Sequence, residues 1–282
     1  MQTIDSLGPL RMVVETLRDS GTLALVPTMG ALHEGHLTLV REAKRHADHV
    51  AASIFVNPRQ FGEGEDLDAY PRRLEEDAAL LEKEGVALLW TPKPEVMYPA
   101  DYTTNISVSG VSEGLCGGDR PGHFDGVATV VCKLFNQVRP DMAFFGEKDW
   151  QQLAVIRRMA RDLDLVRPHV DAIHGVPTVR EADGLAMSSR NAYLSDEERA
   201  AAASLPRAMQ AAIVVMKQGG EPAKVLAGLR EALLDSGFAS VDYAELRDAE
   251  TLEPMSRIGG RPARLLVAAH IGSARLIDNM GV

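Results

Sequence analysis

Cysteine is scarce in this chain, because Cys116 and Cys132 are the only two among 282 residues. Two thiols form at most one disulfide, so the sequence is unlike that of a small secreted domain held together by several bridges. We therefore expect both thiols to be reduced, as in a protein of the cytoplasm.

An excess of basic residues is also missing. Lys and Arg number 30 against 40 Asp and Glu, which gives a formal net charge of −10 and a pI near 5.3. A broad electrostatic surface for nucleic acid is therefore not expected. An anionic small molecule remains a possible substrate if a local cluster of donors works against the overall field.

Long apolar runs and leader-like segments are absent as well. No apolar stretch approaches the ~20 residues that span a bilayer. The first residues, MQTIDSLGPLRMVV, include the acidic Asp5 and no basic segment followed by an apolar run, so we expect no secretory signal. We expect a cytoplasmic protein without a membrane partner.

Apolar runs of strand length alternate with helical patterns through the first two thirds of the chain. The predicted strands cover 23–26, 48–56, 86–90 and 142–145, with further strands near 169–173. The predicted helices cover 6–20, 33–46, 74–84, 124–138 and 149–162. This alternation is typical of βαβ units and predicts a Rossmann-like, mainly parallel sheet that binds ligands at the carboxyl ends of its strands.

The pattern changes after residue 178. Ser195 and Glu198 have the spacing of a capping box at the start of an alanine-rich helix. A helix over 223–236 and short strands over 241–246, 263–269 and 274–277 follow. We therefore expect an α/β fold with two domains, a Rossmann-like sheet domain over 1–178 and a smaller α+β domain over 179–282 that closes over the site.

Two histidines flank a glycine directly after the first apolar strand, in PTMGALHEGH. At the start of a helix, His33 and His36 lie on one face, and free N–H groups and the helix dipole favour a phosphate there. Gly35 would let a ligand approach the backbone. A zinc-protease helix needs a different spacing, HExxH, and two histidines alone do not make a zinc site. The pair could equally be surface residues without a role, so the motif alone decides little.

Two later stretches also carry phosphate-binding side chains. FFGEKDWQQL brings Lys148 as a cation, Asp149 as an acceptor for ribose hydroxyls, and Gln152 on the same helical face. READGLAMSSRN adds Ser188, Ser189 and the guanidinium of Arg190 in a loop at the proposed domain boundary. Each stretch could alone be an ordinary polar loop or helix start. The chain has no GxGxxG and no GxxxxGK[ST] motif, so neither a dinucleotide fingerprint nor a P-loop accounts for these strand ends.

The strand end in SIFVNPRQF supplies neutral amides. Asn57 and Gln60 are suited to fix a small hydroxylated acid. Further along, Glu76 and Asp77 are candidate ligands for a Mg²⁺ ion that accompanies a nucleotide. Acids at this position could instead complement the dipole of the helix that begins there, which is the preferred interpretation for Glu75.

In this order, these stretches resemble the pantothenate synthetase (pantoate–β-alanine ligase) family. The resemblance runs from PTMGALHEGH through SIFVNPRQF, RPGHFDGVATVV, FFGEKD and PTVREADGLAMSSRNAYL to the late RLIDN. HEGH matches the HxGH signature of a nucleotidyltransferase group, and MSSRN resembles its KMSKS-type loop. The resemblance implies that ATP and pantoate form an enzyme-bound pantoyl adenylate and pyrophosphate, with Mg²⁺, before β-alanine displaces AMP to give pantothenate.

The resemblance also assigns roles to individual residues. The groups implied to bind the triphosphate and the transition-state charge are His33, His36, Lys148, Ser188, Ser189 and Arg190, of which His33, His36, Lys148 and Arg190 are the catalytic candidates. The residues implied to hold the rest of ATP are Gly146 and Asp149 at the ribose, Val179 and Met187 at the adenine, and Met29. Those implied for pantoate are Gln60, Gln152 and Asn57, with Met29 and Phe145 against its dimethyl group. Asp77 is the implied metal contact, which Glu76 could share.

Some features of the resemblance leave questions open. Trp150 stands where tyrosine is expected, and His270 where arginine is common. Arg120 and His123 lie, by the resemblance, over the access path of β-alanine, and their roles stay open. A homodimer is implied without an identifiable interface.

Other functions remain as alternatives. A related HxGH enzyme could transfer a nucleotide to a phosphorylated acceptor, but it should need more basic residues than NPRQF offers. A regulatory module would bind ATP and make no AMP. An aminoacyl-tRNA synthetase is disfavoured by the size and acidity of the chain, since it should present a basic tRNA face.

Overall fold

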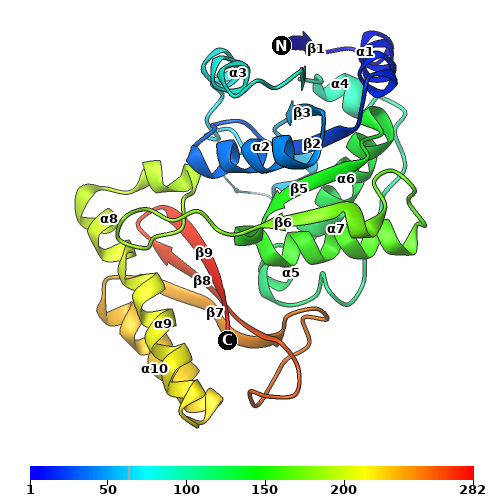
Figure 1. Ribbon diagram of the computed structural model, residues 1–282. Coiled ribbons are helices and arrows are strands. Elements are labelled where there is room, and N and C mark those ends of the chain that lie inside the picture. Colours follow the sequence, from blue (N-terminus) through cyan, green and yellow to red (C-terminus); the bar gives the residue numbers. More distant parts are fainter. Residues whose placement is uncertain (63, 66) are drawn as a thin grey trace.

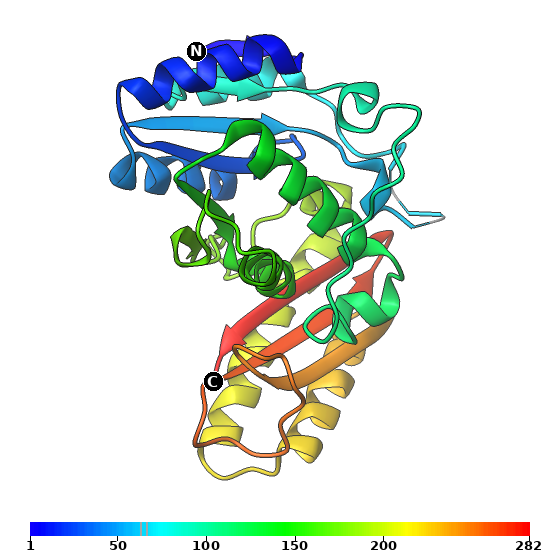
Figure 2. The same cartoon turned by 90° about the vertical axis from the view of Figure 1, so that its right-hand side faces the viewer.

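The computed structural model describes residues 1–62, 64, 65 and 67–282. These residues form a six-stranded parallel sheet surrounded by helices and a smaller three-stranded antiparallel sheet with its own helices (Figure 1). After a rotation of 90°, the small sheet lies between the helices of the large sheet above and α9 and α10 below (Figure 2). The predicted fold class, a Rossmann-like sheet with a smaller α+β part, is confirmed.

The bounds of the elements follow the predicted ranges closely. The large sheet contains β1 (Gln2–Ile4), β2 (Leu23–Thr28), β3 (His49–Ile54), β4 (Leu88–Trp90), β5 (Met142–Gly146) and β6 (Ile173–Val176). Its helices are α1 (Leu7–Asp19), α2 (Glu34–His46), α3 (Leu74–Lys83), α4 (Pro94–Met97), α5 (Leu115–Asp119), α6 (His123–Val138) and α7 (Trp150–Asp162). The rest of the chain forms α8 (Asp196–Ala202), α9 (Ser204–Lys217), α10 (Pro222–Asp235), β7 (Ser240–Asp248), β8 (Ala263–Ile271) and β9 (Ala274–Gly281).

Three local predictions need correction. The sequence pattern did not predict β1, which pairs with β4 at the edge of the sheet. The region near 169–173 contains a 3₁₀ turn, Val170–Ala172, before β6 begins. The alanine-rich helix is two helices, α8 and α9, which meet at Ala203.

The strand order of the large sheet is β1-β4-β3-β2-β5-β6. From β2 the chain continues to β3 on one side, whereas β5 and β6 extend the sheet on the other side. The order therefore reverses between β2 and β5. In an open parallel sheet, such a reversal leaves a crevice at the carboxyl ends of the two strands, and ligands bind there.

Alternation along the strands divides the core between the two faces of the large sheet. Leu23 and Leu25 of β2 point to the face covered by α1, α6 and α7, whereas Ala24 and Val26 point to the face covered by α2 and α3. This period of two is what a strand buried on both faces requires. The helices after β2 and β5, which are α2 and α7, thus lie on opposite faces.

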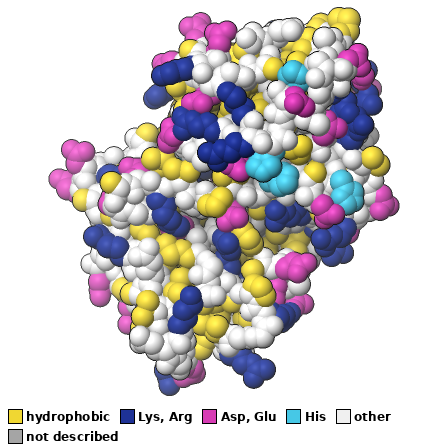
Figure 3. All heavy atoms as spheres, in the orientation of Figure 1, with side chains coloured by type: hydrophobic (Ala, Val, Ile, Leu, Met, Phe, Trp, Pro, Cys, Tyr) yellow, Lys and Arg dark blue, Asp and Glu magenta, His cyan; other side chains and the backbone are white. Residues whose placement is uncertain are grey.

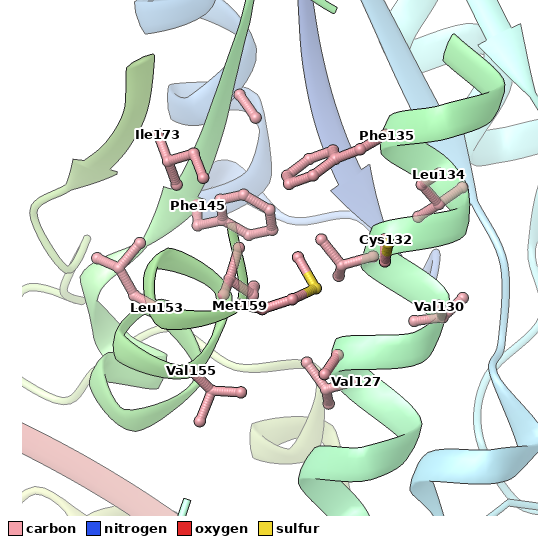
Figure 4. Packing of buried hydrophobic residues seen from close by; sticks show 14 of the residues in the cluster. Val127, Val130, Cys132, Leu134, Phe135, Phe145, Leu153, Val155, Met159 and Ile173 are labelled. Atoms are coloured by element: carbon pink, nitrogen blue, oxygen red, sulfur yellow. The ribbon is translucent and has the colours of Figure 1, made fainter. Parts of the chain in front are cut away.

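The larger core lies between α6, α7 and the sheet. Figure 4 shows side chains of α6, such as Val127 and Phe135, pointing toward Phe145 of β5 and toward Leu153 and Met159 of α7. The rings of Phe135 and Phe145 lie 6.3 Å apart in an edge-to-face arrangement, which aromatic pairs favour.

The small sheet packs one face against α9 and α10, through residues that include Met209, Leu233 and Leu265. The predicted capping box at the start of α8 is confirmed. The hydroxyl of Ser195 accepts from the N–H of Glu198 at 3.2 Å, and the Glu198 carboxylate accepts from the N–H of Ser195 at 2.8 Å.

In the part of the chain that the structure describes, no helix combines the length and apolar character needed to cross a membrane. Charged side chains of both signs are interspersed over the face seen in Figure 3. Cys116 and Cys132 are both buried and free.

Replacement of Phe135 by alanine tests the larger core. Phe135 is 1% exposed, and loss of a buried phenylalanine typically costs about 3–5 kcal/mol because it removes contacts and leaves a cavity. We expect the free energy of unfolding to fall by about this amount in urea titrations followed by tryptophan fluorescence. Val166→Ala, at a residue that is 81% exposed, is the control and should change little. Equal effects of the two substitutions would contradict the packing described here.

Candidate active site

The carboxyl ends of β2, β3, β5 and β6 open onto a pocket of about 230 Å³. Every residue predicted to contact the nucleotide or the acid substrate lines it: Met29, His33, His36, Asn57, Gln60, Phe145, Gly146, Lys148, Asp149, Gln152, Val179, Met187, Ser188, Ser189 and Arg190. The two candidate metal contacts, Asp77 and Glu76, do not line the pocket. The structure therefore brings together side chains from loops that are far apart in the sequence.

The two histidines cap the helix that they begin. His33 is the N-cap residue of α2, and its Nδ1 accepts from the backbone N–H of Gly35 at 3.1 Å. In return, Nδ1 of His36 accepts from the backbone N–H of His33 at 3.3 Å. This is a capping box with imidazoles in place of the usual hydroxyl and carboxylate. The ring centroids lie only 4.1 Å apart.

These contacts fix the tautomer of both rings. Because each Nδ1 accepts a hydrogen bond, the single proton of the neutral ring lies on Nε2. Burial, and then the neighbouring His33, lowers the pKa of His36 from 6.5 to about 3. Burial and the nearby Lys148 also lower the pKa of His33. Near neutral pH the pair therefore offers two Nε2–H donors without positive charge.

Gly35 leaves room for the ring of His33. A Cβ at this position would lie 2.8 Å from Cε1 of His33. The space that a side chain would take is thus filled by the His33 ring. The glycine thus permits the capping contact, and because Gly35 also lines the pocket, the expectation that a ligand approaches its backbone stays a prediction.

Asp77 holds the loop between β2 and α2. The residue is 2% exposed, and its two carboxylate oxygens accept from the N–H groups of Ala31 and Leu32, each at 2.8 Å. Gly30 and Ala31 have positive φ angles of 86° and 51°, so this loop needs strong local contacts to keep its shape. The metal contact predicted for Asp77 stays a prediction. Over the described residues, no group of three or more His, Cys, Asp or Glu side chains is arranged to hold a metal ion.

Lys148 lies in a short 3₁₀ turn, Glu147–Asp149, between β5 and α7. The sequence pattern placed the start of the helix at Asp149, one residue early. Nζ of Lys148 lies 4.0 Å from Oδ2 of Asp149, and the lysine side chain is 19% exposed. Lys148 is thus a partly desolvated cation at the end of β5, across the crevice from the histidines.

The loop that contains SSRN follows a small hairpin in which Arg180 and Ala186 form a bridge. The N–H of Met187 donates to the carbonyl of Val179 at 3.0 Å, so the two predicted adenine contacts lie together. The Ser188 hydroxyl accepts from the N–H of Arg190 at 3.2 Å. Arg190 also lines the pocket.

Asn57 and Gln60, two of the amides predicted to bind the acid substrate, make different contacts. Asn57 is 1% exposed, and its Nδ2 donates to Oε1 of Gln60 and to the carbonyl of Gly126, both at 3.1 Å. Its own oxygen accepts from the hydroxyl of Tyr98 at 2.8 Å. Asn57 is therefore committed to protein contacts that orient Gln60, whose Nε2 lies 2.9 Å from Sδ of Met29.

Several residues that line the pocket were not predicted from the sequence. The apolar wall of the pocket comes from α6, through Val127, Val130, Val131 and Leu134. The signal was present, because this helix is apolar on nearly all sides and must be covered by protein or by a ligand. The contact of the Tyr70 hydroxyl with the Ser189 hydroxyl, at 3.5 Å, had no sequence signal.

A second cavity of about 620 Å³ shares part of this lining and extends toward the small sheet. At the junction, Arg120 forms an ion pair with Glu65 and donates to Nε2 of His123 at 3.1 Å. Nδ1 of His123 donates to the carbonyl of Gln60 at 2.7 Å. Burial, and then Arg120, lowers the pKa of His123 to about 4. The RPGHF motif thus holds the backbone of Gln60 through His123.

Comparison with known proteins gives a consistent result over the whole chain. The family described as pantoate-beta-alanine ligase matches residues 2–281. Pantothenate synthetase of Novosphingobium aromaticivorans is 72% identical, with 100% of this chain and 99% of the relative covered. That of Sphingopyxis alaskensis is 57% identical, with 100% of both covered.

Solved structures agree. The crystal structure of pantothenate synthetase from Thermus thermophilus has a TM-score of 0.91 and 49% identity, with 99% of both chains covered. Pantoate-beta-alanine ligase from Francisella tularensis, complexed with beta-gamma ATP and β-alanine, has a TM-score of 0.83 and 30% identity, with 100% of this chain and 97% of that chain covered.

The tautomer and charge of the histidine pair can be measured. We expect ¹⁵N NMR spectra near pH 7 to show protonated Nε2 and bare Nδ1 on His33 and His36, with assignment from single His→Asn variants. The ring of His36 should stay neutral well below its ordinary pKa of 6.5, because burial lowers that pKa to about 3.

The lowered pKa of His36 also determines how its contribution to stability depends on pH. The unfolded chain takes up a proton as the pH falls through 6.5, and the folded ring does not until about 3. The contribution of His36 to stability is therefore present above 6.5 and is lost progressively toward 3. A titration midpoint near 6.5 would contradict the burial of the ring, and a proton on Nδ1 would show that the capping contacts do not form.

Proposed function

Because the chain belongs to the pantoate–β-alanine ligase family, we propose that the pocket between β2 and β5 is its active site. The protein is an AMP-forming carbon–nitrogen ligase that joins pantoate and β-alanine to give pantothenate at the expense of ATP. The reaction passes through an enzyme-bound pantoyl adenylate and releases pyrophosphate and AMP. The observation that supports the site most is the convergence of neutral donors and cations from three loops on one crevice.

The first step needs alignment and charge stabilisation rather than a protein nucleophile. A carboxylate oxygen of pantoate attacks the α-phosphorus of ATP, and the bond to the pyrophosphate oxygen breaks. Negative charge then builds up on the phosphoryl oxygens and on the leaving pyrophosphate. In our proposal the Nε2–H groups of His33 and His36 donate to these oxygens, and Lys148 and Arg190 supply the positive charge.

Neutral histidines suit this task. Their donors are already in place near neutral pH and need no proton uptake, because burial lowers both pKa values. A lysine in place of either histidine would lose its hydration on burial, which costs a large amount of free energy. The arrangement thus adds neutral donors to the crevice beside the two cations.

We propose that pantoate binds between the amides and the apolar wall. Gln60 and Gln152 would hold its polar groups, with Asn57 acting through Gln60, and Met29 and Phe145 would pack against its dimethyl group. In the second step, the amine of β-alanine attacks the adenylate carbonyl and AMP leaves. The junction formed by Arg120 and His123 joins the two cavities, which supports a path for β-alanine there.

The nucleotide sits, in this proposal, with its ribose at Gly146 and Asp149 and its adenine at Val179 and Met187. Ser188 and Ser189 would contact the triphosphate from the loop before Arg190. Residues 1–178 would form the nucleotide- and pantoate-binding domain, and residues 179–282 a domain that closes over it. The position of the SSRN loop at the mouth of both cavities supports this division.

Three further properties rest on the family resemblance. We propose that Mg²⁺ accompanies ATP and neutralises phosphate charge, that the protein is a homodimer, and that it works in the cytoplasm. An HxGH enzyme that transfers a nucleotide to a phosphorylated acceptor fits the pocket less well. Asn57 and Gln60 offer neutral amides where such an acceptor would need cations.

Isotope exchange tests the order of the chemistry. Labelled pyrophosphate should exchange into ATP when pantoate and Mg²⁺ are present and β-alanine is absent, because adenylate formation needs no amine. In Lys148→Ala the exchange rate should fall by about 10²-fold or more, since one charge-stabilising donor is typically worth this factor. Formation of ADP in place of AMP, or exchange that requires the amine, would refute the adenylate route. Wild-type exchange in Lys148→Ala would remove Lys148 from the site.

Substitution of Asp77 separates its two suggested roles. In Asp77→Asn an NH₂ group faces one of the loop N–H groups, so the loop before His33 loses a hydrogen bond. We expect kcat to fall roughly tenfold or more through misplacement of the histidines, with the Mg²⁺ concentration for half-maximal activity unchanged. Glu76→Gln removes the same charge from the same helical turn, at a side chain that is 72% exposed, and should have little effect. A raised Mg²⁺ requirement in Asp77→Asn alone would instead establish the metal contact.

A further inference from the structure

The late motif RLIDN lies on β9, outside the group of residues proposed to bind ATP and pantoate. Its last two residues, Asp278 and Asn279, are 2% and 5% exposed, although both are polar. Buried polar side chains are costly unless hydrogen bonds satisfy them. The partners of this pair therefore show what the motif does.

The side chains of Asp278 and Asn279 point in opposite directions, because the two residues are consecutive in a strand. Leu276 of β9 packs in the core with α9 and α10, whereas Ile277 packs against the core of the large sheet. Because side chains alternate along a strand, Asp278 points to the side of Leu276 and Asn279 to the side of Ile277. One dipeptide thus reaches two different parts of the molecule.

Asn279 holds the turn that contains Lys148. Its Nδ2 donates to the carbonyl oxygens of Glu147 at 2.9 Å and of Lys148 at 2.8 Å. Its oxygen accepts from Arg264, whose guanidinium lies 3.3 Å from the ring centroid of Trp150. The two N–H groups of the amide and its oxygen are therefore all used, and the backbone of Lys148 is fixed from β9 rather than from its own sheet.

Asp278 holds the hairpin before the SSRN loop. Its carboxylate forms a two-point ion pair with Arg180, with N–O distances of 2.7 and 2.9 Å. Arg180 also donates to the carbonyl of Gly184 at 3.0 Å, across the turn of the hairpin. Such paired contacts fix both distance and orientation. The segment that follows is the one proposed to bring Ser188 and Arg190 to the phosphates.

We propose that Asp278 and Asn279 together are a positioning element, which sets the spacing between the Lys148 turn and the SSRN loop. Asn279 is the positioning residue for Lys148, and Asp278 for Arg190. This inference rests on the proposed function, since it assigns the pair a role through the two cations that stabilise the triphosphate. A purely structural role, in which the pair only joins the two sheets, predicts a different outcome in the following experiment.

The experiment is a double-mutant cycle measured by pyrophosphate exchange with saturating pantoate. Asn279→Ala should lower the exchange rate about tenfold or more, because displacement of a catalytic group by about 1 Å has effects of this size. The KM for pantoate should stay unchanged, since none of the proposed pantoate contacts lies within the Glu147–Asp149 turn that Asn279 holds. In the Lys148→Ala background, Asn279→Ala should change the rate by no more than about twofold, because a residue that acts through Lys148 has no effect once its side chain is removed.

Arg275→Lys is the matched control. Arg275 also lies on β9 and joins the two parts of the chain through Asp119 at 2.8 Å, and its ion pairs are with Asp119 and Asp242 rather than with the Lys148 turn. Any effect of Arg275→Lys should be the same in the wild-type and Lys148→Ala backgrounds. Asn279→Ser, which keeps one donor in a smaller volume, replaces Asn279→Ala in the same cycle if the alanine variant does not fold, as judged by its thermal unfolding.

The second arm of the cycle uses Asp278→Asn. Its effect should disappear in the Arg190→Ala background and persist in the Lys148→Ala background. Effects of Asn279 and Asp278 variants that multiply with those of Lys148 and Arg190 variants would overturn the proposal. Failure of the proposed function shows separately, as a Lys148→Ala variant with wild-type exchange, and it would overturn the positioning role as well.

Discussion

β2 and β5 lie side by side in the large sheet, but the chain leaves them toward opposite faces. α2, which follows β2, packs with Val26 and Val50, and α7, which follows β5, packs with Phe135 and Ile173 of the other core. The two helix starts therefore separate at the carboxyl edge of the sheet and leave a crevice between them. The placement of the histidines on one side and of Lys148 on the other depends on this divergence.

The crevice must attract a triphosphate against a net charge of −10. Its donors are of two kinds. Neutral imidazoles contribute N–H groups with a fixed tautomer, and the lysine and arginine contribute positive charge. In a site with little water, hydrogen-bond donors that are already oriented stabilise developing charge without reorganising, so a few groups suffice. Local arrangement thus outweighs the average field of the protein.

The fold and the composition of the site were largely predictable from the sequence, because both depend on local patterns. Apolar runs located β2, β3 and β5, and the motifs HEGH, EKD and SSRN named the residues that line the pocket. β1 was missed because QTI is short and gains its stability from pairing with β4. The protein contacts of Gly35 and Asn57 were not predictable for a related reason. Each is decided by a neighbour in space, the His33 ring in one case and Gln60, Tyr98 and Gly126 in the other.

The residues that support the site share a physical logic. Asp77, Asn57 and Asn279 are all buried, and their hydrogen-bonding groups are directed at backbone or side-chain partners within the protein. Such a residue tolerates little displacement, because a moved partner leaves a buried polar group unpaired, which costs more than an ordinary hydrogen bond contributes. Loops that contain phosphate-binding groups lack the rigidity of strands. Anchoring each loop to one buried, fully paired side chain gives it a fixed position while its own polar groups stay directed toward the substrate.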